Sequence, residues 1–519
     1  MPQPESHRSF VPPAGWLEDL PAAETGAPLR FLLLATLLGG ALRFLQLAEP
    51  SFWVDEMLTW QALRPDSNPG FWEQFTDTIQ GPLHVAVLWP LVALRESEFM
   101  LRLPSAVAGL AAIPVFGLLA HRLSGAMAAR LATLLFALSP FQIWYSQEGR
   151  GYAFLVLFSL LAVTVYLKMT ERGPRWQSAL AFGLLGAAAI LSNMTGLFLL
   201  VALGAGLVLF HRPRSGRAWL LWTIAFGLAL ALALPWLLKA SGIWAVDRIV
   251  PGGGTGEALR GETTFSWMAL PYTLHTFFYG YSLGPSLREL HAVDRVSILV
   301  ASLPLLVAGA LPVLLGGAVG VVRGRPRRFA VLLWIVIPVV ILILLAVRNV
   351  KPWNPRYAAM VSPFVLLLVC MGLVRLKKPI GVGLSVLLTC LTLWSLYGYY
   401  TDSRYVKEDI RQAAAIVTAG NAAGAPILVP VVTSSFAYYY SGPGEIIDTY
   451  GRPALDSAAA ADAFCDSLLA GRQRCWVVAS RMWFFDPEGF LPTALARRGH
   501  LRVADHAPGV EVYVWSREP

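Results

Sequence analysis

An adjacent pair of acidic residues, Asp55 and Glu56, stands among bulky apolar residues shortly after the first long hydrophobic segment. Carboxylates placed where apolar surface meets water have shifted proton affinities, so one of them can act as a general base. Such a base removes the proton of a hydroxyl nucleophile and makes it reactive. The alternative interpretation is a solvated acidic turn that ends a helix.

Residues that can bind a phosphate or a hydroxyl recur beside later hydrophobic segments. The candidates for substrate binding are His84, Arg102, Glu148, Arg150, Lys351, Arg356 and Tyr357. Guanidinium groups suit a phosphate because their N–H groups form a planar fork, and Arg356 is the first choice for this role. For each arginine the alternative is a side chain that extends to a lipid phosphate, and for His84 it is a packing or capping role.

The composition indicates a mainly α-helical polytopic membrane protein. The chain has 519 residues, of which 56% are hydrophobic and 14% charged, and its mean hydropathy is +0.57. A soluble domain has a much smaller apolar share. The net charge of +9 would suit a nucleic-acid partner, but the basic residues cluster in short loops between apolar segments, so the charge indicates membrane topology and no nucleic acid.

Eleven apolar segments are long enough to cross a bilayer, which needs about 20 residues. They are residues 29–48, 102–122, 127–145, 151–169, 177–192, 195–211, 218–240, 295–322, 328–348, 356–375 and 379–400. The stretch 82–94 is shorter and contains Pro90, so it is predicted to lie in the interface or to re-enter the membrane.

The basic loops all fall on one side of this arrangement, which the positive-inside rule assigns to the cytoplasm. The predicted organisation is a cytoplasmic tail (1–28), a transmembrane domain (29–400) with outer loops 49–101 and 241–294, and an extracytoplasmic domain (401–519). The acid pair then lies outside the cytoplasm. The expected location is the inner (plasma) membrane.

The tail after residue 400 is predicted to form a small α/β domain. Strands are expected at 425–432, 475–479 and 510–515, and helices at 407–419 and 457–469. Cys465 and Cys475 lie in this domain, and both a disulfide and two free thiols remain open. No metal-binding spacing or phosphate-binding glycine loop occurs, so no cofactor is indicated, although a divalent metal at the acids stays possible.

Five short motifs occur in order along the chain. They are Trp53-Val-Asp-Glu, Gly81-Pro-Leu-His84, Glu98-Phe-Met-Leu-Arg-Leu-Pro-Ser105, Ser146-Gln-Glu-Gly-Arg-Gly-Tyr152 and Asn354-Pro-Arg-Tyr357. Together they resemble the GT-C superfamily of membrane glycosyltransferases, and most of all the dolichyl-phosphate-mannose protein mannosyltransferase-like family and the aminoarabinose transferases of lipid A. The resemblance covers roughly residues 30–375.

The resemblance implies transfer of a sugar, with inversion, from a polyprenyl-phosphate-linked donor to an extracytoplasmic acceptor. It makes Asp55 the base, with Glu56 beside it, and leaves open whether the acceptor is a protein, a lipid or a cell-envelope glycan. Two departures stand out. Ser192-Asn-Met-Thr195 replaces a Thr-His pair of many relatives, and Gly81-Pro-Leu-His84 replaces the usual His-Pro-Pro, which leaves the equivalence of His84 open.

Two other functions compete with an enzyme. A transporter or flippase of lipid-linked sugars would favour repeated halves and ionisable residues deep in the membrane, but the sequence contains no internal repeat and the deep segments carry almost no charge. A structural or assembly factor with a degenerate site is the third possibility. The presence of Asp55, Glu56 and Arg356 counts against it.

Overall fold

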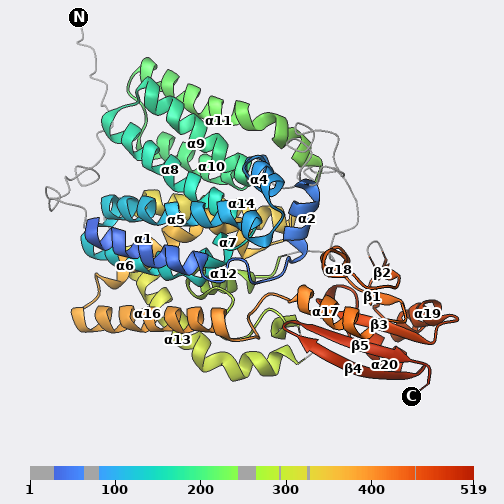
Figure 1. Cartoon of the computed structure of the whole chain (residues 1–519). Helices are drawn as coiled ribbons and strands as arrows, with labels where there is room; N and C mark the ends of the chain where they lie inside the picture. Colours follow the sequence, from blue (N-terminus) through green and yellow to red (C-terminus); the bar gives the residue numbers. More distant parts are fainter. Residues whose placement is uncertain are drawn as a thin grey trace, which may run out of the picture.

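The structure is a computed structural model that describes residues 29–63, 81–243, 265–291, 294–323, 328–449 and 452–518. The predicted tail (1–28) and much of the predicted outer loop 241–294 therefore lie outside the described residues. A bundle of helices makes up the larger part of the molecule, and a small sheet domain lies beyond one end of it (Figure 1).

The bundle is built from the segments that the hydrophobic pattern predicts to be helical. Its α-helices are α1 (Leu29–Phe44), α2 (Val54–Leu63), α4 (Pro82–Leu94), α5 (Glu98–Ser124), α6 (Ala126–Leu138), α7 (Pro140–Ser146), α8 (Tyr152–Arg172), α9 (Trp176–Ser192), α10 (Gly196–Phe210), α11 (Gly216–Ile243), α12 (Ala269–Tyr279), α13 (Arg295–Arg323), α14 (Arg328–Val347), α15 (Ser362–Leu373) and α16 (Lys378–Thr401). Two 3₁₀ helices, η3 (Glu289–His291) and η4 (Pro355–Val361), complete it.

Seven described helices are long and apolar enough to cross a membrane. The pair α6 and α7, bent by 50° at Ser139, would be an eighth span, and α4, α9 and α10 are shorter apolar helices. The protein is thus a multi-pass membrane protein, whereas the total of eleven spans stays a prediction. The stretch 82–94 is helical throughout, with Pro90 inside it.

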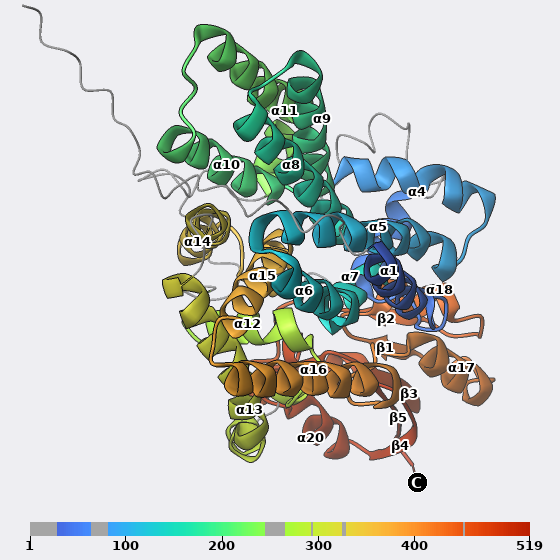
Figure 2. The same ribbon diagram turned by 90° about the vertical axis from the view of Figure 1, so that its left-hand side faces the viewer.

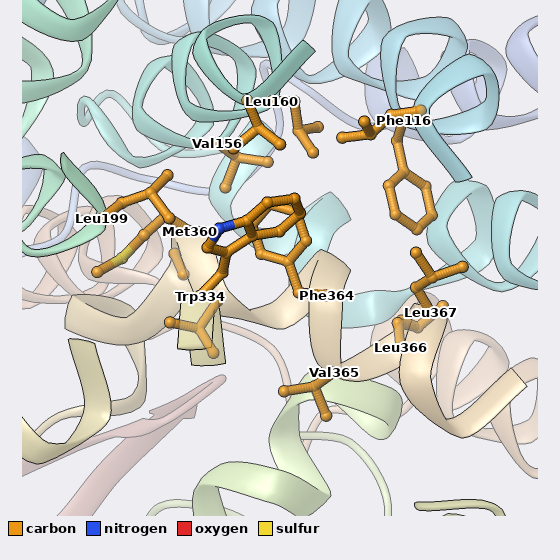
Figure 3. Close-up of a cluster of buried hydrophobic side chains, with 14 of the residues drawn as sticks. Phe116, Val156, Leu160, Leu199, Trp334, Met360, Phe364, Val365, Leu366 and Leu367 are labelled. Carbon is orange, nitrogen blue, oxygen red and sulfur yellow. The ribbon is translucent and has the colours of Figure 1, made fainter. Parts of the chain in front are cut away.

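The centre of the bundle is formed by α15 and the 3₁₀ helix η4 that precedes it. In Figure 2, α15 is surrounded by α6, α12, α14 and α16. Figure 3 shows Trp334 of α14 packed against Met360 and Phe364, and the rings of Trp334 and Phe364 are 5.3 Å apart. A Cβ on Gly372 would be 1.8 Å from the carbonyl oxygen of Gly316, so α13 approaches α15 closely only because both residues are glycine.

The C-terminal domain is a five-stranded mixed sheet with helices on both faces. Its strands are β1 (Ile427–Val429), β2 (Ile446–Asp448), β3 (Arg474–Ala479), β4 (His500–Ala507) and β5 (Val510–Ser516), in the order β2-β1-β3-β5-β4. The strand β1 runs parallel to β2 and β3, while β5 runs antiparallel to β3 and β4. Helices α17 (Ile410–Gly420) and α18 (Thr433–Tyr439) cover one face, and α19 (Ala458–Leu469) and α20 (Phe490–Ala496) cover the other.

The predicted small α/β domain is confirmed, with a strand or helix at each of the five predicted places. The strands β2 and β4 were not predicted. A 3₁₀ turn of this domain, η5, spans Met482–Phe484. Cys465 and Cys475 are both buried and free, so the structure contains two thiols here and no disulfide between them.

The C-terminal domain contacts the bundle at the segment that leads into α2. The backbone N–H of Phe52 donates to the hydroxyl of Tyr439 (2.8 Å). Ser51 Oγ donates to the carbonyl of Glu408 and accepts the N–H of Ile410, both at 2.9 Å. In Figure 1, α2 and α18 lie on the same side of the bundle. The residues just before Asp55 are therefore positioned by both parts of the molecule.

Candidate active site

Asp55 lies in the first turn of α2 and contacts two arginines from distant parts of the sequence. Its Oδ2 forms an ion pair with Nη1 of Arg356, and these side chains are 19% and 18% exposed. The Nη1 of Arg150 donates to the backbone carbonyl of Asp55 (3.2 Å). A carboxylate and two guanidinium groups are thus brought together within one partly solvent-accessible site.

The ionisation of Asp55 follows from these neighbours. Burial by itself raises the pKa of the carboxyl, but Arg356 and Arg150 oppose it and bring the pKa down to about 2. The group is therefore ionised at neutral pH. Its basicity is low as long as Arg356 stays paired with it.

Arg356 is held by aromatic rings. The Oδ1 of Asn354 accepts its backbone N–H (3.1 Å) at the start of η4. The guanidinium carbon lies 5.4 Å from the ring centre of Tyr357 and 5.9 Å from that of Tyr152, at distances where cations are attracted to aromatic faces. Lys351 Nζ is 5.2 Å from the ring of Tyr357. Lys351, Arg356 and Tyr357 therefore form one group beside Asp55.

Glu56 forms a buried ion pair with Arg102 through two hydrogen bonds. Arg102 Nε is 2.8 Å from Glu56 Oε1, and Nη2 is 2.7 Å from Oε2. The backbone N–H of Gly149 also donates to Oε1 (2.8 Å). The remaining N–H groups of the arginine donate to three backbone carbonyls, those of Leu47, Pro50 and Ser51.

All five N–H donors of Arg102 thus have a protein acceptor, and both residues are 0% exposed. The predicted roles of Glu56 in catalysis and of Arg102 in substrate binding remain untested. Their geometry favours positioning instead, because the pair joins α2, α5 and the turn at Gly149 around Asp55.

Glu148 is a second carboxyl close to the site. It is fully buried, and Trp144 Nε1 donates to its Oε2 (3.1 Å), while Oε1 has no hydrogen-bond partner among the described residues. Burial raises the pKa of Glu148 to about 7, although Lys407 and Arg356 oppose the rise. Unlike Asp55, this carboxyl changes its protonation near neutral pH.

His84 does not contact Asp55. Its Nε2 lies 3.3 Å from Ser105 Oγ, and that hydroxyl donates to the backbone carbonyl of Arg150 (3.0 Å). The imidazole edge packs on the ring of Phe154, with 5.5 Å between the ring centres. His84 therefore supports the turn that carries Arg150, and its predicted contact with substrate remains untested.

Two basic residues that the sequence analysis did not select come from the C-terminal part of the chain. Lys407 Nζ lies 4.8 Å from the ring of Trp144 and 5.7 Å from that of Trp53. The guanidinium of Arg481 is 5.0 Å from the same Trp53 ring and pairs with Glu408. No local pattern marks these residues, because only the docking of the C-terminal domain brings them to the segment before Asp55.

In the ranges that the structure describes, no group of three or more His, Cys, Asp or Glu side chains is close enough together to hold a metal ion.

Comparison with known proteins identifies the fold. Residues 80–238 match the family model described as dolichyl-phosphate-mannose-protein mannosyltransferase. ArnT from Cupriavidus metallidurans in the apo state is similar over 94% of this chain and 98% of its own, with a TM-score of 0.52 and 14% identity. This chain has the GT-C glycosyltransferase fold.

A second GT-C structure extends the comparison to a larger protein. The archaeal oligosaccharyltransferase AglB from Archaeoglobus fulgidus, in complex with an inhibitory peptide and a dolichol-phosphate, matches 91% of this chain and 72% of its own, with a TM-score of 0.52 and 12% identity. A search of curated proteins gave no significant match. Glu148 and Arg150 lie inside the stretch matched by the family model, whereas Asp55 and Arg356 lie outside it.

Proposed function

We propose that this protein is an inverting glycosyltransferase that moves a sugar from a polyprenyl-phosphate-linked donor to an acceptor on the extracytoplasmic side of the inner membrane. The single observation that carries the proposal is the contact of Asp55 with Arg356, next to Arg150, on a GT-C fold. A carboxylate beside two guanidinium groups suits a reaction that needs both a base and an anion site. The N-terminus is proposed to face the cytoplasm and the C-terminal domain the opposite side.

The donor phosphate is proposed to bind Arg356 and Arg150. Arginine forks bind phosphate oxygens through paired hydrogen bonds, and cations at this place stabilise the charge that develops on the leaving phosphate. Dolichol-phosphate, a polyprenyl-type phosphate, is present in the AglB complex, which has the same fold. Lys351 and Tyr357 contact the same group of side chains and are proposed to complete the donor site.

The acceptor hydroxyl is proposed to lose its proton to a carboxylate oxygen of Asp55. The acceptor oxygen then forms a bond to the anomeric carbon, and the bond from that carbon to the phosphate oxygen breaks. Its electron pair remains on the polyprenyl phosphate, and a single displacement inverts the anomeric centre. No metal or covalent intermediate is needed for this step to balance.

Arg356 connects donor binding to the strength of the base. Arg356 pairs with Asp55 and keeps the pKa of that carboxyl at about 2. A phosphate that attracts Arg356 weakens this pairing, so the pKa of Asp55 rises and the carboxylate becomes a better proton acceptor. The base is thereby strengthened only after the donor has bound.

The first prediction concerns Asp55→Asn in the purified full-length protein. Because asparagine is similar in size but cannot take the proton, we expect release of polyprenyl phosphate from a panel of polyprenyl-phosphate-linked monosaccharides to fall by about 10²–10⁴-fold. The protein should still insert and elute as a single species in detergent. Chromatographic quantification of the released lipid phosphate measures the rate.

Asp466→Asn is the matched control, since Asp466 lies on the surface of the C-terminal domain with its side chain 68% exposed. Its rate should equal that of the natural protein. Undiminished release by Asp55→Asn would remove Asp55 as the base. Movement of an intact lipid-linked sugar from one leaflet of a vesicle membrane to the other, without release of polyprenyl phosphate, would instead support a flippase.

A further inference from the structure

A large cavity lies between the membrane domain and the C-terminal domain. Its volume is about 1110 Å³. Its walls come from the segment before η4, the segment around η3, the linker 403–408 after α16, and the domain's residues around η5 and between β4 and β5. The volume exceeds the roughly 300–1,000 Å³ of a pocket for one drug-sized molecule, so several linked sugar units would fit.

Aromatic side chains from both domains line this cavity. They include Trp144, Tyr272, Tyr281, Trp353 and Trp483. Two of these positions are fixed by neighbours, since Trp353 Nε1 donates to Thr273 Oγ1 (2.9 Å) and the Trp483 ring stacks on His291 with centres 4.7 Å apart. Rigid amphipathic rings with polar edges suit a ligand that has both C–H faces and hydroxyl groups.

The charges of the cavity wall nearly cancel. Among the described residues its lining includes four Arg or Lys and four Asp or Glu side chains. Arg288 pairs with Glu511 (2.8 Å) and Arg481 with Glu408 (2.6 Å) inside the wall. Because positive and negative side chains are equal in number and two of the four cations are paired inside the wall, the wall as a whole attracts a highly charged ligand little. It therefore favours an uncharged ligand over a phosphorylated headgroup or an acidic polymer.

Lys407 connects the cavity with the proposed active site. It lines the cavity, has no ion pair within 4 Å in the described structure, and lies against the rings of Trp144 and Trp53. Trp144 in turn hydrogen-bonds the buried Glu148, and the cavity lining continues to Asn354 and Pro355, directly before Arg356. The inner end of the cavity is therefore adjacent to the site of Asp55.

We infer that this cavity is the acceptor site and that it takes a neutral oligosaccharide, with Lys407 donating a hydrogen bond to a hydroxyl of the terminal sugar. The inference rests on the proposed transfer reaction and names the class of its acceptor. The C-terminal domain thus contributes directly to substrate recognition, because Trp483 and Arg481 form one wall of the site.

The test is binding of the full-length protein, purified in detergent without any donor, to an array of neutral glycans, acidic glycans and peptides. We expect binding to a subset of the neutral glycans. Trp483→Ala should weaken that binding at least tenfold, whereas Trp483→Phe, which keeps a ring, should retain most of it. Lys407→Met should also weaken binding, with a smaller effect on the apparent melting temperature than on affinity.

Trp394→Ala is the control, since Trp394 is 64% exposed on α16 and does not line the cavity. Binding to no neutral glycan, or preferred binding to acidic glycans or peptides, would overturn the inference. So would undiminished glycan binding by a folded Trp483→Ala. None of these outcomes depends on Asp55, so the release of polyprenyl phosphate tests the proposed reaction separately.

Discussion

Three carboxyl groups near the site differ in their surroundings and therefore in their chemistry. Asp55 is partly exposed, pairs with Arg356 and has a pKa of about 2, while Glu148 is buried with a pKa of about 7. Both carboxylate oxygens of Glu56 accept hydrogen bonds from Arg102. The motif that places Asp55 beside Glu56 in the sequence thus separates into one residue that faces the site and one that holds it together.

The ionisation of Glu148 predicts how stability depends on pH. Its pKa of about 7 in the folded protein is above the ordinary 4.5, so between these values the folded protein binds more protons than the unfolded one. Stability therefore falls as the pH rises through this window. Burial lowers the pKa of His84 to about 3, which makes stability rise with pH up to about 6.5 and opposes the effect of Glu148. We therefore expect the change in apparent melting temperature from pH 5 to pH 8 to be more negative in the natural protein than in Glu148→Gln.

Thermal scans across this pH range measure both proteins under identical conditions. Equal slopes for the two would show that the carboxyl of Glu148 does not titrate in this window. A release rate with a pH midpoint near 7 that is absent in Glu148→Gln would also link this carboxyl to the reaction.

Arg102 provides a prediction about stability that is distinct from binding. Removal of one partner of a buried ion pair costs about 3–5 kcal/mol, because the other charge stays buried and unpaired. Arg102→Ala should therefore strongly lower the apparent melting temperature. Arg122→Ala is the matched control, since its pair with Glu171 is partly exposed and such pairs contribute only about 0–1 kcal/mol. If Arg102→Ala has the same apparent melting temperature as the unsubstituted protein, the positioning role of Arg102 is wrong.

At the scale of elements, the starts of α4 and α8 pack against the end of α9, and this contact brings together the sequence motifs around Gly81, Gly151 and Ser192. A Cβ on Gly81, before α4, would be 2.0 Å from the carbonyl oxygen of Ser192, at the end of α9, and a Cβ on Gly151, before α8, would be 2.4 Å from the same oxygen. The segment that begins at Ser192, where the chain departs from many relatives, is thus a packing junction behind Arg150. The position of Arg150 depends on that junction.

Gly151→Ala tests the junction. The added methyl group must push α8 and α9 apart, at a cost of about 1–3 kcal/mol, and it shifts the neighbouring Arg150. We expect a lower melting temperature and at least a tenfold slower release of polyprenyl phosphate. Gly227→Ala, inside α11, has no atom within 4 Å of the new methyl group and should behave like the natural protein. If Gly151→Ala releases polyprenyl phosphate at the rate of the unsubstituted protein, the turn that carries Arg150 tolerates the added methyl group.

At the scale of the whole molecule, the C-terminal domain holds the segment that carries Asp55. The hydroxyl of Tyr439 accepts the N–H of Phe52 and donates to Glu98 (2.7 Å), and Arg411 pairs with the same glutamate. These bonds link α18 and α17 to the entrance of α2 and to the start of α5. A domain that only covered the membrane part would not need such contacts.

Tyr439→Phe removes that hydroxyl and leaves the Phe52 N–H unpaired, which costs about 1–3 kcal/mol for a buried group. We expect release of polyprenyl phosphate to slow by severalfold, with little change in detergent behaviour. Tyr397→Phe is the control, because Tyr397 is 70% exposed on α16. If both variants keep the natural rate, docking of this domain does not position Asp55.

The sequence by itself determined the membrane class, the places of the helices and the small α/β domain. These follow from local properties, because apolar runs of bilayer length form helices whatever the rest of the chain does. It also singled out Asp55, Arg150 and Arg356, since charged residues beside apolar segments are costly and few. The exposed strand β4 escaped prediction because its residues, mostly exposed, show no alternation of apolar and polar side chains.

Only the tertiary structure decided which charges pair. Glu56 and Arg102 are 46 residues apart and Asp55 and Arg356 are 301 apart, so no spacing rule could connect them. Lys407 reaches the site only because the C-terminal domain docks against the segment before α2. The roles within the site depend on the convergence of distant segments, which is a property of packing and not of local pattern.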